Sequence, residues 1–473
     1  MMWVRSFISH FKKIVLFAAV VVAVTEGMNY LYLDDTQEFA RCMMHEFYEN
    51  RENIDRLYLG SSHVFCDIDP VVLDGINMEN NFNLATSMQQ LNTSYFLLRE
   101  ADGRNEIDRV YLDLAYQCTS AGPGNLHDYK WIPKSWFVQD QMRPSLNKLA
   151  YMLDLSGPEY YYITFLPFMR YREKLFDWEH VAGTVKGKQT EEWKNYEYTY
   201  TTPEGETVRK RGGKGFRIYY GTLEHGNFYA GYRETGIEEN PMTLESMEYL
   251  EKIVAYCRER DIELTWISSP TSDFELVHKG GYDNYIRQVR ELAESYGVPY
   301  YDFNLCRREY LDLGQGRYWF DMGHMNRDGA EVYSQFLGSF LKAQETGEDT
   351  YGDCFYDSYE EKLESLPEEI FGLQFVPSQD YERFMPEMSK EQCEEYVIYL
   401  FRPVTNAPDR DMDIDIEIHV TGKDDTEREE DVQVMRDGGE AYVIRSIHEH
   451  GVMNVTVKFK DTVEEMRWEQ IVY

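Results

Sequence analysis

Short apolar runs alternate with amphipathic stretches over most of the chain up to about residue 345. Each run is a few residues long and is bounded by polar or turn-forming residues, as buried strands are. The predicted strands are Arg56–Leu59, Phe82–Ala85, Arg109–Ala115, Glu263–Ser268 and Val298–Phe303. Between them, apolar residues recur at helical spacing over Ser87–Glu100, Thr243–Arg260, Asp283–Tyr296 and Arg327–Leu341. Repeated units of this kind predict an α/β fold with a five-stranded parallel sheet flanked by helices.

Two regions break this alternation. Residues 118–242 form a long insertion after the third predicted strand, rich in Trp and Tyr, which form a local core or stack on sugar rings. Residues 365–473 lose the helical period and alternate apolar with polar positions instead. The clearest alternating runs are Glu395–Phe401, Asp413–Val420, Ala441–Ile447 and Val452–Phe459. We therefore predict an all-β sandwich appended to the α/β domain of residues 36–345.

The N-terminus carries an apolar run from Ile14 to Val24 that continues, after Glu26, to Leu33. Counted to Leu33 it reaches the roughly 20 residues of a bilayer span. Basic residues precede the run and acidic residues follow it: Arg5, Lys12 and Lys13, then Asp34, Asp35 and Glu38. Under the positive-inside rule this places the body outside the cytoplasm. We predict a single-pass signal anchor over residues 1–35, with a secreted protein if the segment is cleaved and a buried helix as the other alternative.

Charge and cysteine content exclude several classes of protein. The chain has 48 Lys and Arg against 84 Asp and Glu, a net charge of −36, so binding of nucleic acid over its surface is excluded. Its seven cysteines include no CxxC pair, so neither a zinc knuckle nor a disulfide scaffold is expected. One basic run, residues 209–217, stands out and predicts either a solvated hairpin tip or a site for anionic polymer or lipid headgroups.

Two short motifs carry candidate chemistry. Gly60-Ser61-Ser62-His63 ends the first predicted strand, where open α/β sheets bind their ligands. Asp321 and His324 precede the last helix, which we expect Asn326 to cap. A serine becomes a nucleophile when a neutral imidazole takes its proton, and a carboxylate on the far ring nitrogen holds that imidazole in the required tautomer.

Other residues compete with this interpretation. Asp177 and His180 repeat the D-x-x-H spacing, but they lie in the insertion without a strand and helix around them, so we interpret them as a coincidence. The residue types His63, Cys66 and Asp67 suggest a metal site, but no second ligand cluster accompanies them, so we interpret them as a turn beside the candidate active site. We expect neither a metal nor an organic cofactor.

Both motifs together resemble the SGNH/GDSL hydrolase family, in which a G-D-S block ends the first strand and a D-x-x-H block precedes the last helix. The resemblance covers residues 54–342 apart from the insertion. It implies a flavodoxin-like fold, with Ser62 as nucleophile and Asp321 and His324 completing the triad. For the oxyanion hole we expect the backbone N–H of Ser62 as the first donor, with the side chains of Asn83 and Gln117 as further candidates whose alternative is a structural role.

The chain also departs from the family's pattern. Ser61 stands where the family has an acidic residue, residues 83–87 lack the glycine of the second block, and residues 112–117 lack the asparagine of the third. These departures concern the oxyanion hole rather than the triad.

Together with the predicted anchor, the resemblance implies an exported esterase or O-acyltransferase acting on acyl esters of a cell-surface glycan. In this combination of features, the chain is similar to alginate and peptidoglycan O-acetyltransfer proteins and to the D-alanyl-transfer protein of the teichoic-acid pathway. The implied partners are an acylated polysaccharide or teichoic-type polymer and a membrane acyltransferase that supplies acyl units. The alternative is a catalytically inactive SGNH-fold module that binds glycan or scaffolds an envelope assembly complex. A secreted lipase is less favoured, because no broad apolar lid stands out.

Overall fold

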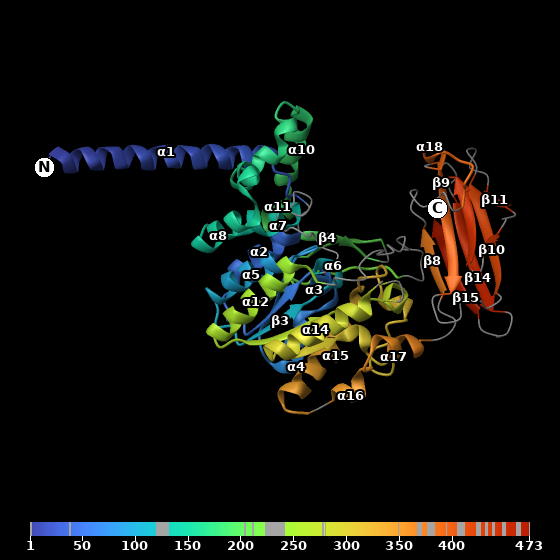
Figure 1. Ribbon diagram of the computed structural model, residues 1–473. Helices are drawn as coiled ribbons and strands as arrows, with labels where there is room; N and C mark the ends of the chain where they lie inside the picture. The colour runs from blue at the N-terminus through green and yellow to red at the C-terminus, as the bar shows by residue number, and fades with distance from the viewer. Residues whose placement is uncertain are drawn as a thin grey trace.

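A computed structural model describes most of the chain (Figure 1). The described residues are 2–36, 39–119, 132–202, 205–210, 212–222, 242–276, 279, 281–348, 350–366, 371–375, 384–393, 395–403, 412–421, 427–430, 434–437, 440–446, 451–459 and 465–472.

A five-stranded sheet forms the centre of the α/β body, in the order β2-β1-β3-β6-β7. Its strands are β1 (Arg56–Gly60), β2 (Asn81–Ala85), β3 (Arg109–Asp113), β6 (Glu263–Ser268) and β7 (Tyr300–Asp302). Every pairing in the sheet is parallel. The predicted fold class is confirmed, and the strand order is the flavodoxin-like one, with β1 beside both β2 and β3. Strands β1 and β2 are buried at every position and β3 at all but its first, which is why they appear in the sequence as short, mostly apolar runs, whereas β6 and β7 are buried only toward their carboxyl ends.

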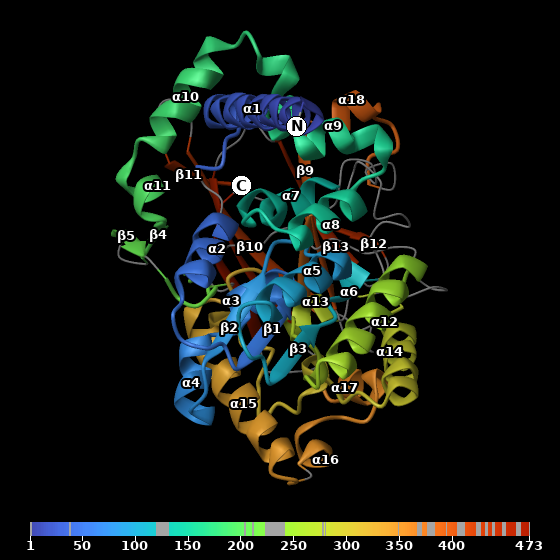
Figure 2. The same ribbon diagram turned by 90° about the vertical axis from the view of Figure 1, so that its left-hand side faces the viewer.

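Helices cover both faces of the sheet (Figure 2). On one face α15 packs against α3 and α4, and on the other α12 packs against α5. These helices are α3 (Ser62–Asp67), α4 (Pro70–Asn77), α5 (Leu91–Asp102), α12 (Leu244–Glu259), α14 (Tyr282–Tyr296) and α15 (Arg327–Glu345). The remaining short elements of the body are α2 (Phe39–Glu49), α6 (Tyr116–Thr119), α13 (Asp273–Leu276), η4 (Phe303–Leu305), η5 (Gly316–Tyr318), α16 (Tyr351–Cys354) and α17 (Tyr359–Glu364). A single large hydrophobic cluster fills the space between sheet and helices.

The described part of the insertion is mainly helical, and its helices are followed by a β-hairpin. Its elements are α7 (Ile132–Gln141), α8 (Leu146–Leu155), η1 (Pro158–Tyr160), α9 (Tyr161–Phe165), η2 (Pro167–Lys174), α10 (Trp178–Lys188), α11 (Glu191–Asn195), β4 (Tyr198–Thr201) and β5 (Thr207–Lys210). Beyond the hairpin, the carbonyl of Lys214 accepts the N–H of Asn83 in β2, at 2.9 Å, and its Nζ bonds Asp74 and Asn80. Part of the basic run therefore ties the insertion to the sheet instead of forming a solvated tip.

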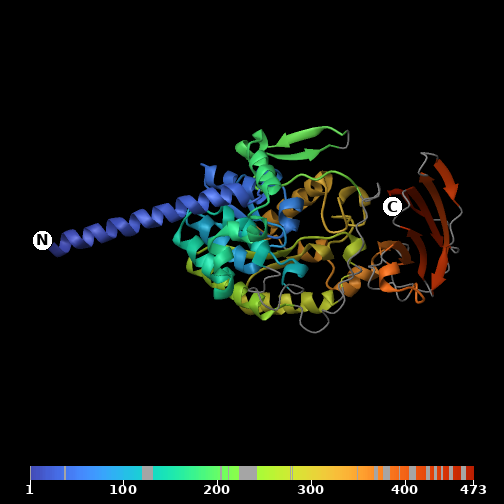
Figure 3. The ribbon, with the colours of Figure 1, turned by 90° about the horizontal axis from the view of Figure 1, so that it is seen from above.

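Helix α1 (Met2–Tyr32) projects away from the α/β body (Figure 3). Within it, His10–Tyr32 is long and apolar enough to cross a membrane, and none of the described window is buried in the protein. This matches the length and composition expected of an anchor.

The C-terminal region forms two four-stranded antiparallel sheets, ordered β11-β10-β14-β15 and β12-β13-β9-β8. The strands are β8 (Phe371–Phe375), β9 (Tyr396–Pro403), β10 (Met412–Thr421), β11 (Glu427–Glu430), β12 (Met435–Asp437), β13 (Glu440–Ser446), β14 (Gly451–Phe459) and β15 (Glu465–Val472), with the short helix α18 (Lys390–Cys393) before β9. The four alternating runs of the sequence correspond to β9, β10, β13 and β14.

Candidate active site

Ser62 lies at the carboxyl end of β1, as the first residue of α3. The preceding Ser61 is extended, with φ −89° and ψ −159°, so the chain turns from strand to helix within one residue. Gly60 makes this turn possible, because a Cβ at this position would lie 2.6 Å from atoms of Asp113 and Val64. The nucleophile candidate is thus held at the edge of the sheet where ligands bind in such folds.

Residues 262 positions apart in the chain meet at this edge. His324 Nε2 lies 2.7 Å from Ser62 Oγ. On the other side of the ring, His324 Nδ1 lies 2.9 Å from both carboxylate oxygens of Asp321. A carboxylate accepts only, so Nδ1 donates its proton to Asp321, and in the neutral ring Nε2 is left to accept the hydroxyl proton of Ser62. The structure therefore brings together all three residues of the predicted triad.

The loop before α15 holds the acid and the imidazole in this arrangement. Asp321 Oδ1 also accepts the backbone N–H groups of Gly323, at 2.9 Å, and His324, at 2.8 Å. Two residues after His324, Asn326 Oδ1 accepts the N–H of Gly329 at 3.0 Å, which caps α15 as predicted. The cap and the Asp321 turn together limit how far His324 can move.

Asp321 and His324 perturb each other's protonation. Burial alone lowers the pKa of His324, but its hydrogen bond to Asp321 and the charges of Asp321, Asp67 and Glu275 outweigh burial and raise the pKa to about 9. Burial opposes ionisation of Asp321, but its bonds to the His324 ring and to two backbone N–H groups lower its pKa below the usual value. The pair is therefore built to favour an imidazolium beside a carboxylate, the charge state that forms when serine is deprotonated.

Asp67 is a residue of this site that the sequence interpretation did not assign. It lies at the end of α3 and is fully buried. Its Oδ1 accepts the N–H of Met325, next to His324, at 2.8 Å. Burial raises the pKa of Asp67 well above the usual range. Because it joins the nucleophile helix to the histidine loop, Asp67 positions the two halves of the site; a lone acid within the apolar segment of residues 64–68 was the signal for it.

The two amides predicted as oxyanion donors have other contacts. Asn83 Nδ2 donates to the carbonyls of Val64, at 3.2 Å, and Ile68, at 2.8 Å, so it stabilises the C-terminal end of α3. Gln117 Nε2 donates to Glu275 Oε1 at 3.1 Å. The backbone N–H of Ser62, in the first turn of α3, belongs to the group of amides that a helix leaves without an intrahelical acceptor. Oxyanion roles for these three groups stay a prediction.

The competing motifs have structural contacts in the insertion and the core. His180 Nε2 lies 3.0 Å from the carbonyl of Tyr32, and Asp177 caps α10, so this D-x-x-H pair joins the insertion to α1. His63 and Asp67 approach each other at 3.9 Å. Among the described residues there is no group of three or more His, Cys, Asp or Glu side chains that could hold a metal ion. All seven cysteines lie in described segments, and none forms a disulfide.

Comparison with known proteins gives little beyond the fold. No family model matches the chain, and no curated protein matches it. Among solved structures, one described as a G-D-S-L family lipolytic protein from Desulfitobacterium hafniense has a TM-score of 0.29 and 7% identity, covering 61% of this chain and 99% of its own. One described as a platelet activating factor from Streptococcus pneumoniae has a TM-score of 0.29 and 12% identity, covering 68% and 99%. An acylhydrolase structure from Bacteroides fragilis has a TM-score of 0.27 and 6% identity, covering 63% and 94%. At these values the chain is only faintly similar to the three proteins, and their activities carry no argument for its own.

Proposed function

We propose that the protein is a membrane-tethered serine hydrolase of the SGNH type, either an esterase or an O-acyltransferase. The observation that carries this proposal is the 2.7 Å contact between Ser62 Oγ and His324 Nε2, with Asp321 on the opposite ring nitrogen. A serine whose proton faces a carboxylate-held imidazole is suited to attack on an ester carbonyl.

The reaction would proceed in two half-reactions. As Ser62 Oγ bonds to the ester carbonyl carbon, His324 Nε2 takes the hydroxyl proton, and Asp321 stabilises the imidazolium. His324 then gives the proton to the departing alcohol, which leaves an acyl group on Ser62. Water or a second hydroxyl next attacks the acyl-serine, again through His324, and releases a free acid or a new ester while Ser62 recovers its proton.

The substrate class follows from location rather than from the triad. Helix α1 is of a length and composition suited to an anchor, and the positive-inside rule favours an extracytoplasmic body. An esterase held there would act on acyl groups of cell-surface glycans, including teichoic-type polymers. As an acyltransferase it would depend on a membrane partner that delivers activated acyl units.

Covalent labelling tests the proposal directly. A fluorophosphonate should react with the wild-type chain and not with Ser62→Ala, and an activated aryl ester should give a burst of one aryl alcohol per chain that Ser62→Ala abolishes. His180→Ala is the matched control, because it removes the histidine of the other D-x-x-H pair and should keep both signals. Labelling that is unchanged in Ser62→Ala would refute the assignment.

A catalytically inactive glycan-binding module is the second candidate. The observation that favours it is the commitment of the Asn83 and Gln117 amides to other partners, which leaves fewer donors for an oxyanion. Such a module would bind glycan without reacting with the fluorophosphonate, so the same experiment separates the two candidates.

A further inference from the structure

The last turn of α1 is held by the insertion. Lys188 Nζ donates to the carbonyls of Asn29, at 3.2 Å, and Tyr30, at 3.1 Å. The N–H of Phe168 donates to Asn29 Oδ1 at 3.0 Å, and Tyr32 donates its hydroxyl proton to a carbonyl of the insertion at 2.8 Å. Because the apolar segment His10–Tyr32 ends at these contacts, a bilayer crossed by α1 has its outer surface next to the insertion.

Exposed apolar side chains gather in this part of the insertion. Outside α1, eleven large hydrophobic side chains are exposed among the described residues, and six of them fall between residues 146 and 178. The six, which we name the apolar rim, are Leu146, Leu149, Leu153, Tyr162, Phe176 and Trp178. Phe176 is 89% exposed and Trp178 is 74% exposed. Single exposed apolar residues are ordinary, but several in one part of a protein mark an interaction surface.

Helix α8 carries half of the apolar rim as a single stripe. Leu146, Leu149 and Leu153 follow the spacing of one helix face, and all three are exposed. The opposite face is also apolar, with Tyr151 and Leu155 buried in the insertion. A helix with an apolar stripe on its outer face as well as its inner face is suited to a second nonpolar environment on its outer side.

The elements that carry the apolar rim connect to α1 through direct packing. Helix α1 packs against η2 and α10, η2 packs against α9, and α9 packs against α8. Figure 2 shows α8, α9 and α10 grouped around α1 on the side from which it leaves the body. A membrane crossed by α1 would therefore meet this side first.

Charge in the insertion also differs from that of the rest of the chain. Residues 132–202 contain nine Lys and Arg and nine Asp and Glu, whereas the whole chain carries a net −36. The strongly acidic remainder would be repelled by an anionic lipid surface, and the balanced insertion would not. Tyr and Trp side chains such as those of the apolar rim are enriched where membrane meets water.

We propose that the apolar rim inserts into the outer leaflet of the bilayer that α1 crosses, so that the body is seated on the membrane rather than suspended from a single helix. This inference rests on the membrane tether of the proposed function and adds an orientation to it. Two attachments, one through the bilayer and one on its surface, would prevent rotation of the body about α1 and present the same face to the surface polymer.

Site-specific fluorescence on the full chain tests whether the apolar rim inserts into the bilayer. In a Cys42→Ser background, whose remaining cysteines are buried, single cysteines at Leu146 and Phe176 would carry an environment-sensitive nitrobenzoxadiazole label. Leu146→Cys and Phe176→Cys, reconstituted in phosphatidylcholine vesicles, should show blue-shifted emission and quenching by lipids that bear a nitroxide near the headgroup. Matched controls are Met78→Cys and Leu244→Cys, which replace equally exposed apolar residues outside the insertion and should show neither effect.

A label at Val20→Cys, near the middle of α1, is read with lipids that carry the nitroxide deep on the acyl chain, because this position would lie near the bilayer centre. It separates a failure of rim insertion from a failure of the membrane tether. If the Val20 label is quenched but the Leu146 and Phe176 labels behave like the controls, α1 crosses the bilayer and the proposed insertion of the apolar rim is wrong. If no label is quenched, the tether itself fails, whatever the esterase assay reports on the triad. If the rim labels shift only in native membranes and not in pure lipid, a membrane protein covers the rim, and that result also overturns the proposal.

Discussion

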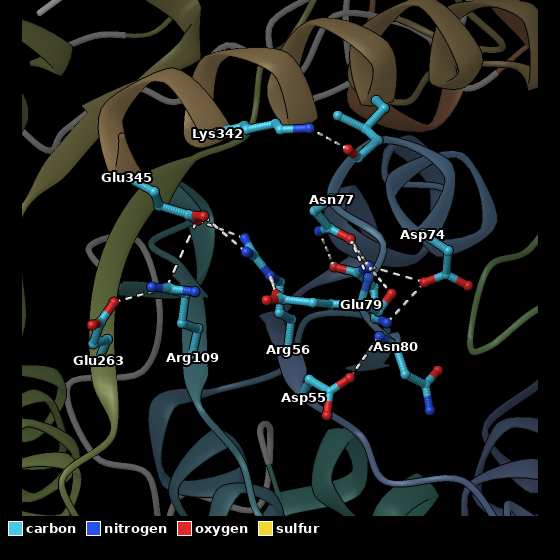
Figure 4. A network of polar contacts seen from close by, with 12 residues as sticks. Asp55, Arg56, Asp74, Asn77, Glu79, Asn80, Arg109, Glu263, Lys342 and Glu345 are labelled. Atoms are coloured by element: carbon cyan, nitrogen blue, oxygen red, sulfur yellow. Dashed lines mark hydrogen bonds and ion pairs between the residues drawn. The ribbon is translucent and has the colours of Figure 1, made fainter. Parts of the chain in front are cut away.

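The two ends of the central sheet differ in how their buried charged groups are partnered. At the amino ends of the strands, Arg56 is 3% exposed and each of its nitrogens has a partner (Figure 4). It forms a two-bond contact with Glu345, at 2.6 and 2.8 Å, and also bonds Glu79 and, at 2.9 Å, the hydroxyl of Tyr111. Such a satisfied network joins β1, β3 and α15 and contributes to stability only while it is complete.

The carboxyl ends of the same strands hold polar atoms that lack partners. Among the described residues, the buried atoms without a hydrogen bond include Asp67 Oδ2, Asp113 Oδ2 and Ser61 Oγ. Burial raises the pKa of Asp113 to about 6, although the N–H of Ser269 bonds its other oxygen at 2.8 Å. Each unmade bond costs about 1–3 kcal/mol. The difference teaches that one end of the sheet secures the fold, while the other accepts a cost in stability around the triad.

The largest effect is expected when the acid of the triad is replaced. Asp321→Asn should lower kcat/KM by about 10⁴-fold, because an amide no longer holds the His324 tautomer that accepts from Ser62. Its free energy of unfolding should also fall at pH values below the folded pKa of His324, because the raised pKa of His324 and the lowered pKa of Asp321 mean that the pair stabilises the folded state, so kcat/KM is compared per folded molecule. Ester hydrolysis kinetics beside urea unfolding measure both quantities; a loss of activity below tenfold would contradict the assigned role.

The same variant has a defined effect on pH dependence. His324 must be neutral to accept a proton, so wild-type kcat/KM should rise with pH through its pKa of about 9. Since the Asp321 carboxylate is a main cause of that raised pKa, Asp321→Asn should move the rise to lower pH. If kcat/KM of Asp321→Asn rises over the same pH range as that of the wild type, a group other than His324 controls this rise.

The next effect tests the amino ends of the strands. Arg56→Met should lower the free energy of unfolding by about 3 kcal/mol, because Glu345 and Tyr111 lose a buried partner. kcat/KM per folded molecule should remain unchanged. Arg143→Met is the control: Arg143 and its partner Glu49 are 47% and 56% exposed at their side chains, so a loss of only about 0.5 kcal/mol is expected. Equal losses in the two variants would remove the distinction between buried and exposed contacts.

A smaller effect of opposite sign is expected at the carboxyl ends. The pKa of Asp67 is raised in the folded state, so its penalty is absent below the unfolded value and grows as pH rises toward the folded value. Asp67→Asn keeps an acceptor for the Met325 N–H and removes the ionisable group. We expect a gain of about 1 kcal/mol in unfolding free energy at pH 8 and none at pH 4. A pH-independent change in stability would be inconsistent with this cause.

An effect of about the same size concerns the cap of α15. Asn326→Ala should cost about 1 kcal/mol in unfolding free energy, because the first-turn N–H of Gly329 loses its acceptor. Asn326→Asp keeps an acceptor oxygen and should recover most of that loss. Thermal unfolding of the three proteins measures the series, and an Asn326→Asp variant as unstable as Asn326→Ala would assign the effect to the Nδ2 contacts with Gly221 and Arg317 instead.

Local pattern predicted the sheet well. The strand over Glu263–Ser268 was predicted with the bounds of β6, and the strand at Arg109 ends two residues earlier than predicted, at Asp113. The sandwich was predicted less completely: β8, β11, β12 and β15 were missed. Fully buried strands and long amphipathic helices leave a strong periodic signal, whereas short edge strands leave a weak one. The helices of the insertion were not predicted, because several are single turns set by their surroundings.

The sequence by itself determined the elements that carry chemistry: a serine after a strand, an Asp-x-x-His before a capped helix and an apolar segment near the N-terminus. Their periodicity and capping are local properties, which the order of residues encodes directly. Only the tertiary structure decided that Ser62 and His324 are neighbours, that Asp67 joins their two segments and that Asn83 stabilises the C-terminal end of α3. These contacts depend on which residues the parallel sheet brings to one edge, and no local pattern of residues specifies that.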